Sequence, residues 1–433
     1  MVSVIVKPTL RCNAACAYCS SANAARSSRD RMPPAVLERL FDRVHEFLTE
    51  RPRETVVITW HGGEPLLMGP GFFEDVLACQ RRSCGTTASR IAHRLQTNLT
   101  LFGERFVAPL RRLGLFGIGT SYEPLPGLRG LGKARDCDAY RERFHEAVRL
   151  LEAERFGWGL IYVVTRPALD RAEEIFAELI RLKPDGNISL HAVDPGPDGA
   201  GDLAISPRQF ADFLGTVFTT WWPRRERHPH VEPFRSLTRS ILDGVPHLYC
   251  REAGTCAATH LGVEPDGTYS HCGRASDRQV LEYGSVFERS FAEVLADPRR
   301  VPIAGRQTTL RQGACRDCRL WSLCHGGCPL DAVDATGDFA APSPWCEATK
   351  AFIEDHFEPI TGTRYHGGKM PILIKHGDRY YEIPDEVLAS SGLTREQFEQ
   401  RLQKLGTDVA DPARDRRDNC NFIDLAACRV EDF

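Results

Sequence analysis

Apolar residues recur along the first 230 residues with two alternating periods. The short apolar runs at 2–8 (VSVIVKP) and 55–60 (TVVITW) indicate strands. The run at 33–50 spaces its apolar residues by three and four, as one face of a helix requires. Further strands are predicted at 93–98, 116–121 and 159–165, and further helices at 71–82 and 140–154. This alternation predicts an α/β fold with a parallel sheet built from βαβ units.

The pattern changes after about residue 230. Strand-like runs become few, and residues 250–346 are dense in cysteine and glycine and only weakly periodic. Such a region can fold around metal clusters instead of a large apolar core. With roughly 150 residues per domain as a guide, we expect two or three domains.

A separate small unit is predicted near the C-terminal end of the chain. Residues 361–369 resemble a linker, and His376-Gly377-Asp378 between two apolar runs indicates a hairpin turn. The run at 393–406 fits a helix that starts with a capping box and is followed by glycine. We therefore predict a hairpin–helix unit over 370–412 and a tail over 413–433, with a charged, non-periodic and flexible segment over 407–419.

The composition gives no reason to expect a membrane protein, an exported protein or a nucleic-acid-binding protein. The sequence has no run of about 18 apolar residues, so no membrane-spanning helix is predicted. The N-terminus lacks the basic and apolar regions of a signal peptide, and a net charge of −3 gives no reason to expect nucleic-acid binding. We therefore expect a cytoplasmic protein with no nucleic-acid or membrane partner. The sixteen cysteines are clustered, which in cytosolic chains is more typical of metal ligands than of disulfides.

Three of these cysteines follow the first predicted strand directly. Cys12, Cys16 and Cys19 form the pattern C-x-x-x-C-x-x-C. Three thiolates can hold three irons of a [4Fe–4S] cube and leave the fourth iron open to a small molecule, whereas electron-transfer clusters use four protein thiolates. The alternative is a zinc site that takes His45 or His61 as its fourth ligand.

The run CNAACAYC resembles the signature of radical S-adenosyl-L-methionine (SAM) enzymes. HGGEP at 61–65 resembles the glycine-rich motif that follows the second strand of that family, and only glycine lets a backbone approach a ligand so closely. The resemblance implies a partial (β/α)6 TIM-like barrel and a catalytic [4Fe–4S] cluster on the three cysteines whose open iron binds SAM. The SAM-binding residues that it implies are Tyr18, Gly62, Gly63, Glu64, Pro65, Gln96, Thr97, Asn98, Ser121 and Arg135.

One departure from the family pattern lies at residues 121–124. The family often reads S-x-D-G there, and this chain reads SYEP. Glu123 stands in place of the acid, and the sequence assigns it no role.

Eight further cysteines occupy residues 250–346. Their spacing, C-x10-G-x4-C from Cys256 and C-x2-C-x5-C-x3-C from Cys315, resembles the SPASM extension of peptide-modifying radical enzymes such as anaerobic sulfatase-maturating enzymes. The resemblance implies two auxiliary [4Fe–4S] clusters. One would use Cys250, Cys256, Cys272 and Cys328, and the other Cys315, Cys318, Cys324 and Cys346. A structural zinc array is the alternative.

The resemblance implies domain boundaries, and one departure from the family pattern limits what can be inferred about the reaction. A radical SAM core is expected over 1–230 and a SPASM domain over 231–360. Sulfatase-maturating enzymes carry an Asp beside the third cysteine of the extension, where this chain has Gly273, so formylglycine formation is not expected. The remaining cysteines are interpreted as plain buried residues: Cys79, Cys84 and Cys137.

The last sixteen residues contain the pattern C-x-x-x-D twice, as Cys420 with Asp424 and Cys428 with Asp432. This tail resembles precursors of ranthipeptides, in which a cysteine sulfur is joined to the Cβ of an aspartate. We therefore predict a peptide maturase that forms such thioethers in a ribosomal precursor, fused here as a leader-like segment (370–412) and a core-like segment. An electron donor such as flavodoxin or ferredoxin would be a partner.

Two alternatives remain from the sequence. The triplet FID at 422–424 fits radical cyclophane synthases, which would join Phe422 to the Cβ of Asp424. That reading leaves Asp432 unexplained. An iron–sulfur electron carrier or sensor is the non-enzyme alternative, and it leaves the open-iron motif and HGGEP unexplained.

Overall fold

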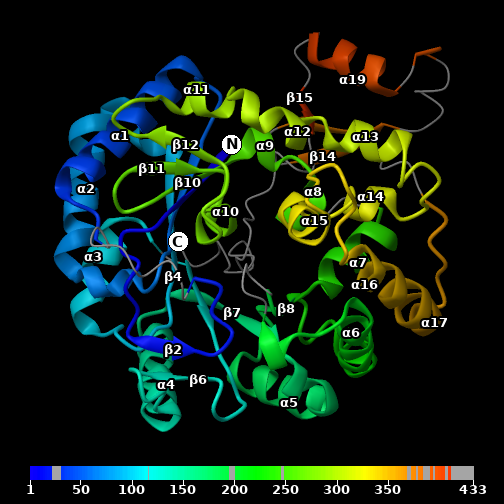
Figure 1. The fold of residues 1–433 in the computed structure, drawn as a ribbon, viewed down its shortest axis with the longest axis horizontal. Coiled ribbons are helices and arrows are strands. Elements are labelled where there is room, and N and C mark those ends of the chain that lie inside the picture. Colours follow the sequence, from blue (N-terminus) through cyan, green and yellow to red (C-terminus); the bar gives the residue numbers. More distant parts are fainter. Residues whose placement is uncertain are drawn as a thin grey trace.

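A mostly parallel sheet organises the protein, with helices along its outer side (Figure 1). The structure is a computed structural model. It describes residues 1–21, 31–115, 117–194, 200–244, 248–367, 372–376, 379–383, 391–393, 395–404 and 408–410.

The main sheet has ten strands in the order β12-β11-β10-β1-β3-β4-β5-β7-β8-β9. Neighbouring strands from β10 to β9 in this order run parallel, and β11 and β12 add antiparallel pairs at one edge. The strands are β1 (Val2–Val6), β3 (Val56–Trp60), β4 (Ile91–Gln96), β5 (Gly117–Ser121), β7 (Gly157–Val164), β8 (Ile188–Ala192), β9 (Val231–Glu232), β10 (His260–Val263), β11 (Thr268–Ser270) and β12 (Glu282–Ser285). The predicted α/β class with a parallel sheet is confirmed.

Amphipathic helices connect the parallel strands, as the periodicity predicts. They are α1 (Pro34–Glu50), α2 (Pro70–Cys84), α3 (Glu104–Arg112), α4 (Cys137–Ala153), α5 (Ala172–Leu182) and α6 (Pro207–Trp221). The predicted apolar face of α1 is buried in the core, and its residues are Val36, Leu37, Leu40, Phe41, Val44 and Phe47. Helix α4 begins three residues before its predicted start, because the Asp136 carboxylate accepts a hydrogen bond from the Ala139 amide at 3.0 Å and caps it.

The sheet continues past residue 230, into the segment where a second domain was expected. Strand β10 pairs in parallel with β1, from Ser3 opposite His260 to Val6 opposite Val263. The cysteine-rich region is therefore joined to the first strand by backbone hydrogen bonds. A separate ribbon pairs β2 (Ala14–Cys16) with β6 (Arg129–Leu131) and sets Cys16 opposite Arg129.

Short helices make up most of the cysteine-rich region, and many begin or end at a cysteine. They are α7 (Phe234–Ile241), α8 (Cys250–Ala253), α9 (Cys256–Thr259), α10 (Gly273–Asp277), α11 (Phe291–Leu295), α12 (Val301–Ala304), α13 (Arg306–Gln312), α14 (Trp321–Cys324), α15 (Pro329–Thr336), α16 (Cys346–Phe352) and α17 (Glu358–Thr361). Cys272 and Cys328 stand directly before α10 and α15. No helix in the described part of the chain is long and apolar enough to cross a membrane.

The C-terminal unit contains the predicted hairpin and helix. Strand β13 (Ile372–His376) pairs antiparallel with β14 (Arg379–Ile383), and α19 (Arg395–Lys404) follows. The sequence did not predict β15 (Asp408–Ala410), which pairs with the other side of β13. The predicted core-like segment, with Cys420, Asp424, Cys428 and Asp432, lies outside the described residues.

Candidate active site

A cavity of about 230 Å³ lies beside the loop that follows β1 and the ends of β3, β4, β5 and β8. The carboxyl ends of parallel strands meet at one edge of a sheet, where ligands of α/β proteins usually bind. Most of the predicted SAM-site residues line this cavity. They are Cys12, Cys16, Tyr18, Cys19, Gly62, Gly63, Gln96, Thr97, Asn98 and Ser121.

The three cysteines of the first motif lie together on the wall of the cavity. The Sγ atom of Cys12 accepts hydrogen bonds from the Ala14 amide at 3.4 Å and from Nδ2 of Asn98 at 3.7 Å. Burial raises the pKa of the Cys12 thiol to about 12 and that of Cys19 to about 11. In the metal-free protein these thiols hold their protons at neutral pH, so binding of iron must release them.

Gly62 and Gly63 have a structural role in addition to the predicted approach to a ligand. A Cβ atom on Gly63 would lie 2.2 Å from the carbonyl oxygen of Arg11, and one on Gly62 would lie 2.3 Å from that of Thr9. The Gly63 amide donates to the Thr9 oxygen at 2.9 Å. The two glycines therefore let the end of β3 pack directly against the loop that carries Cys12.

Glu64 was predicted to contact SAM; in this structure its carboxylate is hydrogen-bonded within the protein and does not line the cavity. It accepts hydrogen bonds from the Leu66 amide at 2.9 Å, from Oγ1 of Thr97 at 2.6 Å and from the Asn98 amide at 2.7 Å. Burial raises the pKa of Glu64, while these bonds favour its charged form. Glu64 therefore fixes Thr97 and Asn98, which do line the cavity. Pro65 begins the turn behind it and is also outside the lining.

Arg135 also lies outside the lining, and Arg129 lines the cavity instead. The Arg135 side chain donates to the carbonyl oxygens of Ala15 at 2.9 Å and Gly127 at 3.1 Å, so it braces the β2–β6 ribbon. Arg129 stands opposite Cys16 on that ribbon, and its guanidinium carbon lies 5.0 Å from the centre of the Tyr140 ring. Sequence reasoning missed Arg129 because only the pairing of β2 with β6 brings it next to the cysteines.

The far wall of the cavity consists of ionisable residues that sequence reasoning also missed. His191 and Asp194 come from the end of β8 and the residues after it, and Arg274 and Asp277 come from α10. Lys7 Nζ lies 2.6 Å from Asp277 Oδ1. Burial, followed by the neighbouring Arg251 and Arg274, lowers the pKa of His191 to about 3, so its imidazole is neutral at physiological pH.

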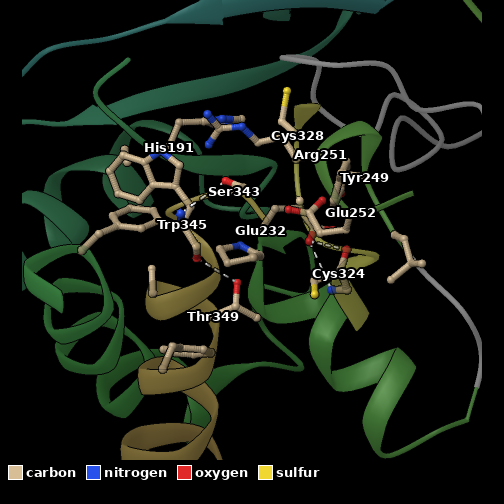
Figure 2. Close-up of a pocket in the computed structure, with 18 of the residues that line it drawn as sticks. His191, Glu232, Tyr249, Arg251, Glu252, Cys324, Cys328, Ser343, Trp345 and Thr349 are labelled. Carbon is tan, nitrogen blue, oxygen red and sulfur yellow. Dashed lines mark hydrogen bonds between the residues drawn. The ribbon is translucent and has the colours of Figure 1, made fainter. Parts of the chain in front are cut away.

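A second cavity of about 160 Å³ adjoins the first (Figure 2). The two share the wall residues His191, Ala192, Arg251 and Arg274. In Figure 2, Trp345 and Thr349 line one side of this cavity, Tyr249, Glu252 and Cys324 lie on the other, and Cys328 lies at the top of the view. Its cysteines are Cys250, Cys324, Cys328 and Cys346.

The cysteines of this region fall into two spatial groups. Burial raises the pKa of Cys256, and the nearby Cys328 and Cys272 raise it further. Burial raises the pKa of Cys324 to about 12, with further increases from Cys346, Cys318 and Cys315. These groups match the two predicted ligand sets, except for Cys250.

Cys250 is disulfide-bonded in this structure, whereas the other seven cysteines of the two sets are free thiols. In the described part of the chain, no group of three or more His, Cys, Asp and Glu side chains is arranged for a single metal ion. A [4Fe–4S] cube spreads its four ligands over four irons, so it needs thiols further apart than one zinc ion does.

The residues present fit a SAM-binding iron–sulfur site. Three grouped thiols face the cavity, and the buried Oε1 atom of Gln96 on its wall has no hydrogen-bond partner among the described residues. Cys12, Cys16 and Cys19 would hold the cluster. Together with SAM, that cluster supplies a radical reagent able to break an unactivated C–H bond.

Comparisons with known proteins agree with this geometry. Residues 6–126 match the family model of the radical SAM superfamily. The chain is 25% identical over 368 residues to a serine-type anaerobic sulfatase-maturating enzyme of Bacteroides thetaiotaomicron, covering 77% of this chain and 84% of that protein.

Two solved structures show the same fold. The enzyme anSMEcpe with bound SAM superimposes with a TM-score of 0.71 at 21% identity, over 84% of this chain and 98% of that one. Streptococcus suis SuiB bound to the precursor peptide SuiA superimposes with a TM-score of 0.52 at 17% identity, over 79% of this chain and 74% of that one.

The fold and the site together define an enzyme of the radical SAM class, and residues 6–126 form its radical SAM domain. Membership of this class implies SAM and a [4Fe–4S] cluster as cofactors. The similarity to the sulfatase-maturating enzyme extends beyond that domain, because it spans most of both chains.

Proposed function

We propose that this enzyme is a peptide maturase that joins cysteine sulfur to aspartate Cβ in C-x-x-x-D segments of a precursor peptide. The SPASM-type region 231–360 would hold two auxiliary clusters. The unit at 370–412 would act as a leader, and 413–433 would be the segment that is modified. In the similar proteins, one enzyme matures sulfatases and SuiB has been seen with a precursor peptide, which supports a peptide or protein substrate.

The observation that carries this proposal is the wall shared by the two cavities. One cavity contains the three-cysteine motif, and the adjoining cavity is lined by cysteines of both further sets. Among the described residues, four line both cavities: His191, Ala192, Arg251 and Arg274. The radical site proposed here would therefore lie next to a second set of thiols, and this proximity supports an oxidative crosslink as the reaction.

The balance of the reaction shows why both sites are needed. Formation of one thioether breaks a C–H bond at Cβ and an S–H bond, and it forms one C–S bond. The radical reagent that SAM and the first cluster would supply would take up a hydrogen atom from the carbon, and the thiol would release its proton. One electron is left over, and it needs a one-electron acceptor. Iron–sulfur clusters on the second set of cysteines would supply that redox chemistry.

Formylglycine formation, the reaction of the sulfatase-maturating relatives, is not proposed. Gly273 stands beside Cys272, where those enzymes carry an Asp. A Cβ atom on Gly273 would lie 3.2 Å from Cγ2 of Ile5, so even the first atom of an Asp side chain would crowd β1. Packing against the Ile5 side chain and the sequence therefore both disfavour that chemistry at this position.

The test is tandem mass spectrometry of the full chain after anaerobic turnover with SAM and a chemical reductant. Two thioethers remove four hydrogens and protect Cys420 and Cys428 from alkylation. Asp424→Ala should remove one crosslink and expose Cys420 only, and Phe422→Ala should leave both crosslinks. If Phe422→Ala instead abolishes the mass loss at Asp424, and Cys420 is alkylated in the processed wild type, the product is a cyclophane.

A further inference from the structure

Arg274 lies where the two cavities meet, and its side chain is 6% exposed. Its three guanidinium nitrogens contact three different partners. Nε donates to Oδ2 of Asp194 at 2.9 Å, and one terminal nitrogen donates to Oδ1 of Asp331 at 2.6 Å. The other terminal nitrogen donates to the Sγ atom of Cys328 at 3.1 Å. Arg274 thus connects the wall of the SAM cavity to a cysteine of the second group.

The shape of the side chain is essential to this connection. A guanidinium is planar, is always charged and presents five N–H donors in a rigid fork. The carboxylates of Asp194 and Asp331 balance its buried charge. The remaining terminal nitrogen can therefore donate to the sulfur of Cys328. A lysine ammonium in the same place would keep the positive charge but could not hold all three partners at these angles.

A hydrogen bond to a ligand sulfur has a known consequence for redox chemistry. Such bonds, like nearby positive charge, stabilise the more negative reduced state of an iron–sulfur centre and so raise its reduction potential. An acceptor of the electron that crosslinking leaves behind needs a potential high enough to take it.

We propose that Arg274 is a positioning residue that raises the reduction potential of the iron–sulfur centre held by Cys328 and at the same time fixes Asp194 at the wall of the SAM cavity. This inference rests on the proposed function for its purpose. The test of this inference does not depend on the proposed function, because the reduction potential is measured without any peptide turnover.

Arg278 is the matched control on the same helical face. It lies four residues further along, is 9% exposed and also pairs with Asp194, at 2.7 Å. Its Nε atom bonds Asp334 at 2.7 Å. The hydrogen bonds found for its side chain go to Asp194, Asp334 and a backbone oxygen, and none goes to a sulfur. Arg278→Lys therefore tests the fixing of Asp194 and the packing of the helix without disturbing the bond to Cys328.

The experiment is a potentiometric titration monitored by electron paramagnetic resonance, with Arg274→Lys and Arg278→Lys each placed in a chain whose Cys12, Cys16 and Cys19 are changed to Ala. The triple change removes the signal of the first cluster. Arg274→Lys should lower the midpoint potential of one auxiliary cluster by about 59 mV, the one-electron equivalent of a tenfold change in equilibrium constant. Arg278→Lys should leave the potential unchanged at equal iron content.

Equal potentials in the parent triple-Ala chain with and without Arg274→Lys, or equal shifts with Arg274→Lys and Arg278→Lys, would overturn the proposal. If Arg274→Lys binds less iron, Arg274→Gln replaces it, because an amide removes the positive charge while remaining a polar N–H donor. The midpoint potential of Arg274→Gln is then compared with that of Arg278→Lys by the same criteria. A shifted potential in an enzyme that forms no thioether would refute the proposed product while leaving the assignment of Arg274 intact.

Discussion

The backbone amide and carbonyl groups of the parallel sheet and of the cysteine-rich region find their hydrogen-bond partners in different ways. In the sheet, strands such as β1 and β3 are fully buried, and their amides and carbonyls bond to neighbouring strands. In the cysteine-rich region the helices are short and many carbonyls belong to loops. Buried backbone groups need partners in either case, because an unpaired one costs as much as a lost hydrogen bond.

Buried arginines supply those partners in the cysteine-rich region. Arg306 is 3% exposed, and its guanidinium donates to five carbonyl oxygens. They belong to His325, Gly326, Gly327, Phe339 and Ala341, at distances of 2.7 to 3.2 Å. Arg300 does the same for Ala257 at 2.8 Å and His260 at 3.1 Å. The sheet region is therefore stabilised by its buried apolar strands and their backbone pairing. The cysteine-rich region is stabilised in part by guanidinium–carbonyl hydrogen bonds.

The largest expected effect is that a change in the first cysteine motif abolishes activity without removing iron from the cysteine-rich region. Cys12→Ala should abolish formation of 5′-deoxyadenosine while leaving about eight irons per chain, at four irons per cluster. The reason is that the first motif and the two later groups form separate sites. Iron analysis and chromatography of turnover mixtures measure the two outcomes. Cys79→Ala, at a buried cysteine in α2, is the control and should retain both iron and activity. Continued 5′-deoxyadenosine formation by Cys12→Ala would contradict the assignment of the cluster.

The second effect tests whether arginines hold the cysteine-rich region. Arg306→Ala leaves five carbonyls without their donor, and we expect a loss on the order of 3 to 5 kcal/mol in unfolding free energy. Urea unfolding and limited proteolysis around residues 325–341 measure it.

The control for that comparison is Arg90→Ala in the sheet region. Arg90 donates to the carbonyl oxygens of Leu48 at 2.8 Å and of Arg51 and Glu54 at 3.0 Å, but it is only partly buried. Water can replace its bonds, so the loss should stay below about 1 kcal/mol. Equal losses in the two variants would mean that the two regions do not differ in this respect.

The smallest effect compares two buried carboxylates. Burial raises the pKa of Glu123, in the sheet region, to about 7, whereas Arg251 and Arg274 outweigh burial and lower the pKa of Asp331. A raised pKa means that the folded protein binds the Glu123 proton more tightly than the unfolded chain does. Stability is therefore lost as pH rises from the ordinary range of a Glu, about 4.5, through 7.

Glu123→Gln should remove that loss. At about 1.4 kcal/mol per pKa unit, the variant should gain on the order of 3 kcal/mol over the wild type at pH 8 and below about 1 kcal/mol at pH 5. Urea unfolding of the metal-free protein at the two pH values checks the sign. A difference between variant and wild type that is the same at both pH values would show that the charge of Glu123 is not responsible.

The sequence by itself determined the parts of this enzyme that depend on local pattern. Apolar spacing located α1 and the first strands, because period decides which side chains can face a core. The resemblance of the cysteine motifs to known families suggested three thiol groups, and in the structure Cys256 lies near Cys272 and Cys328, and Cys324 near Cys315, Cys318 and Cys346.

Tertiary structure decided what depends on residues distant in the chain. Arg129 reaches the cavity only through the register of β2 with β6, and β10 completes the sheet only by pairing with β1. Glu64 points to Thr97 and Asn98 because a buried carboxylate needs donors, and the end of β4 supplies them. Arg274 meets Asp194 and Cys328 across separations of 80 and 54 residues, so no local pattern could have shown that the two cavities share this contact.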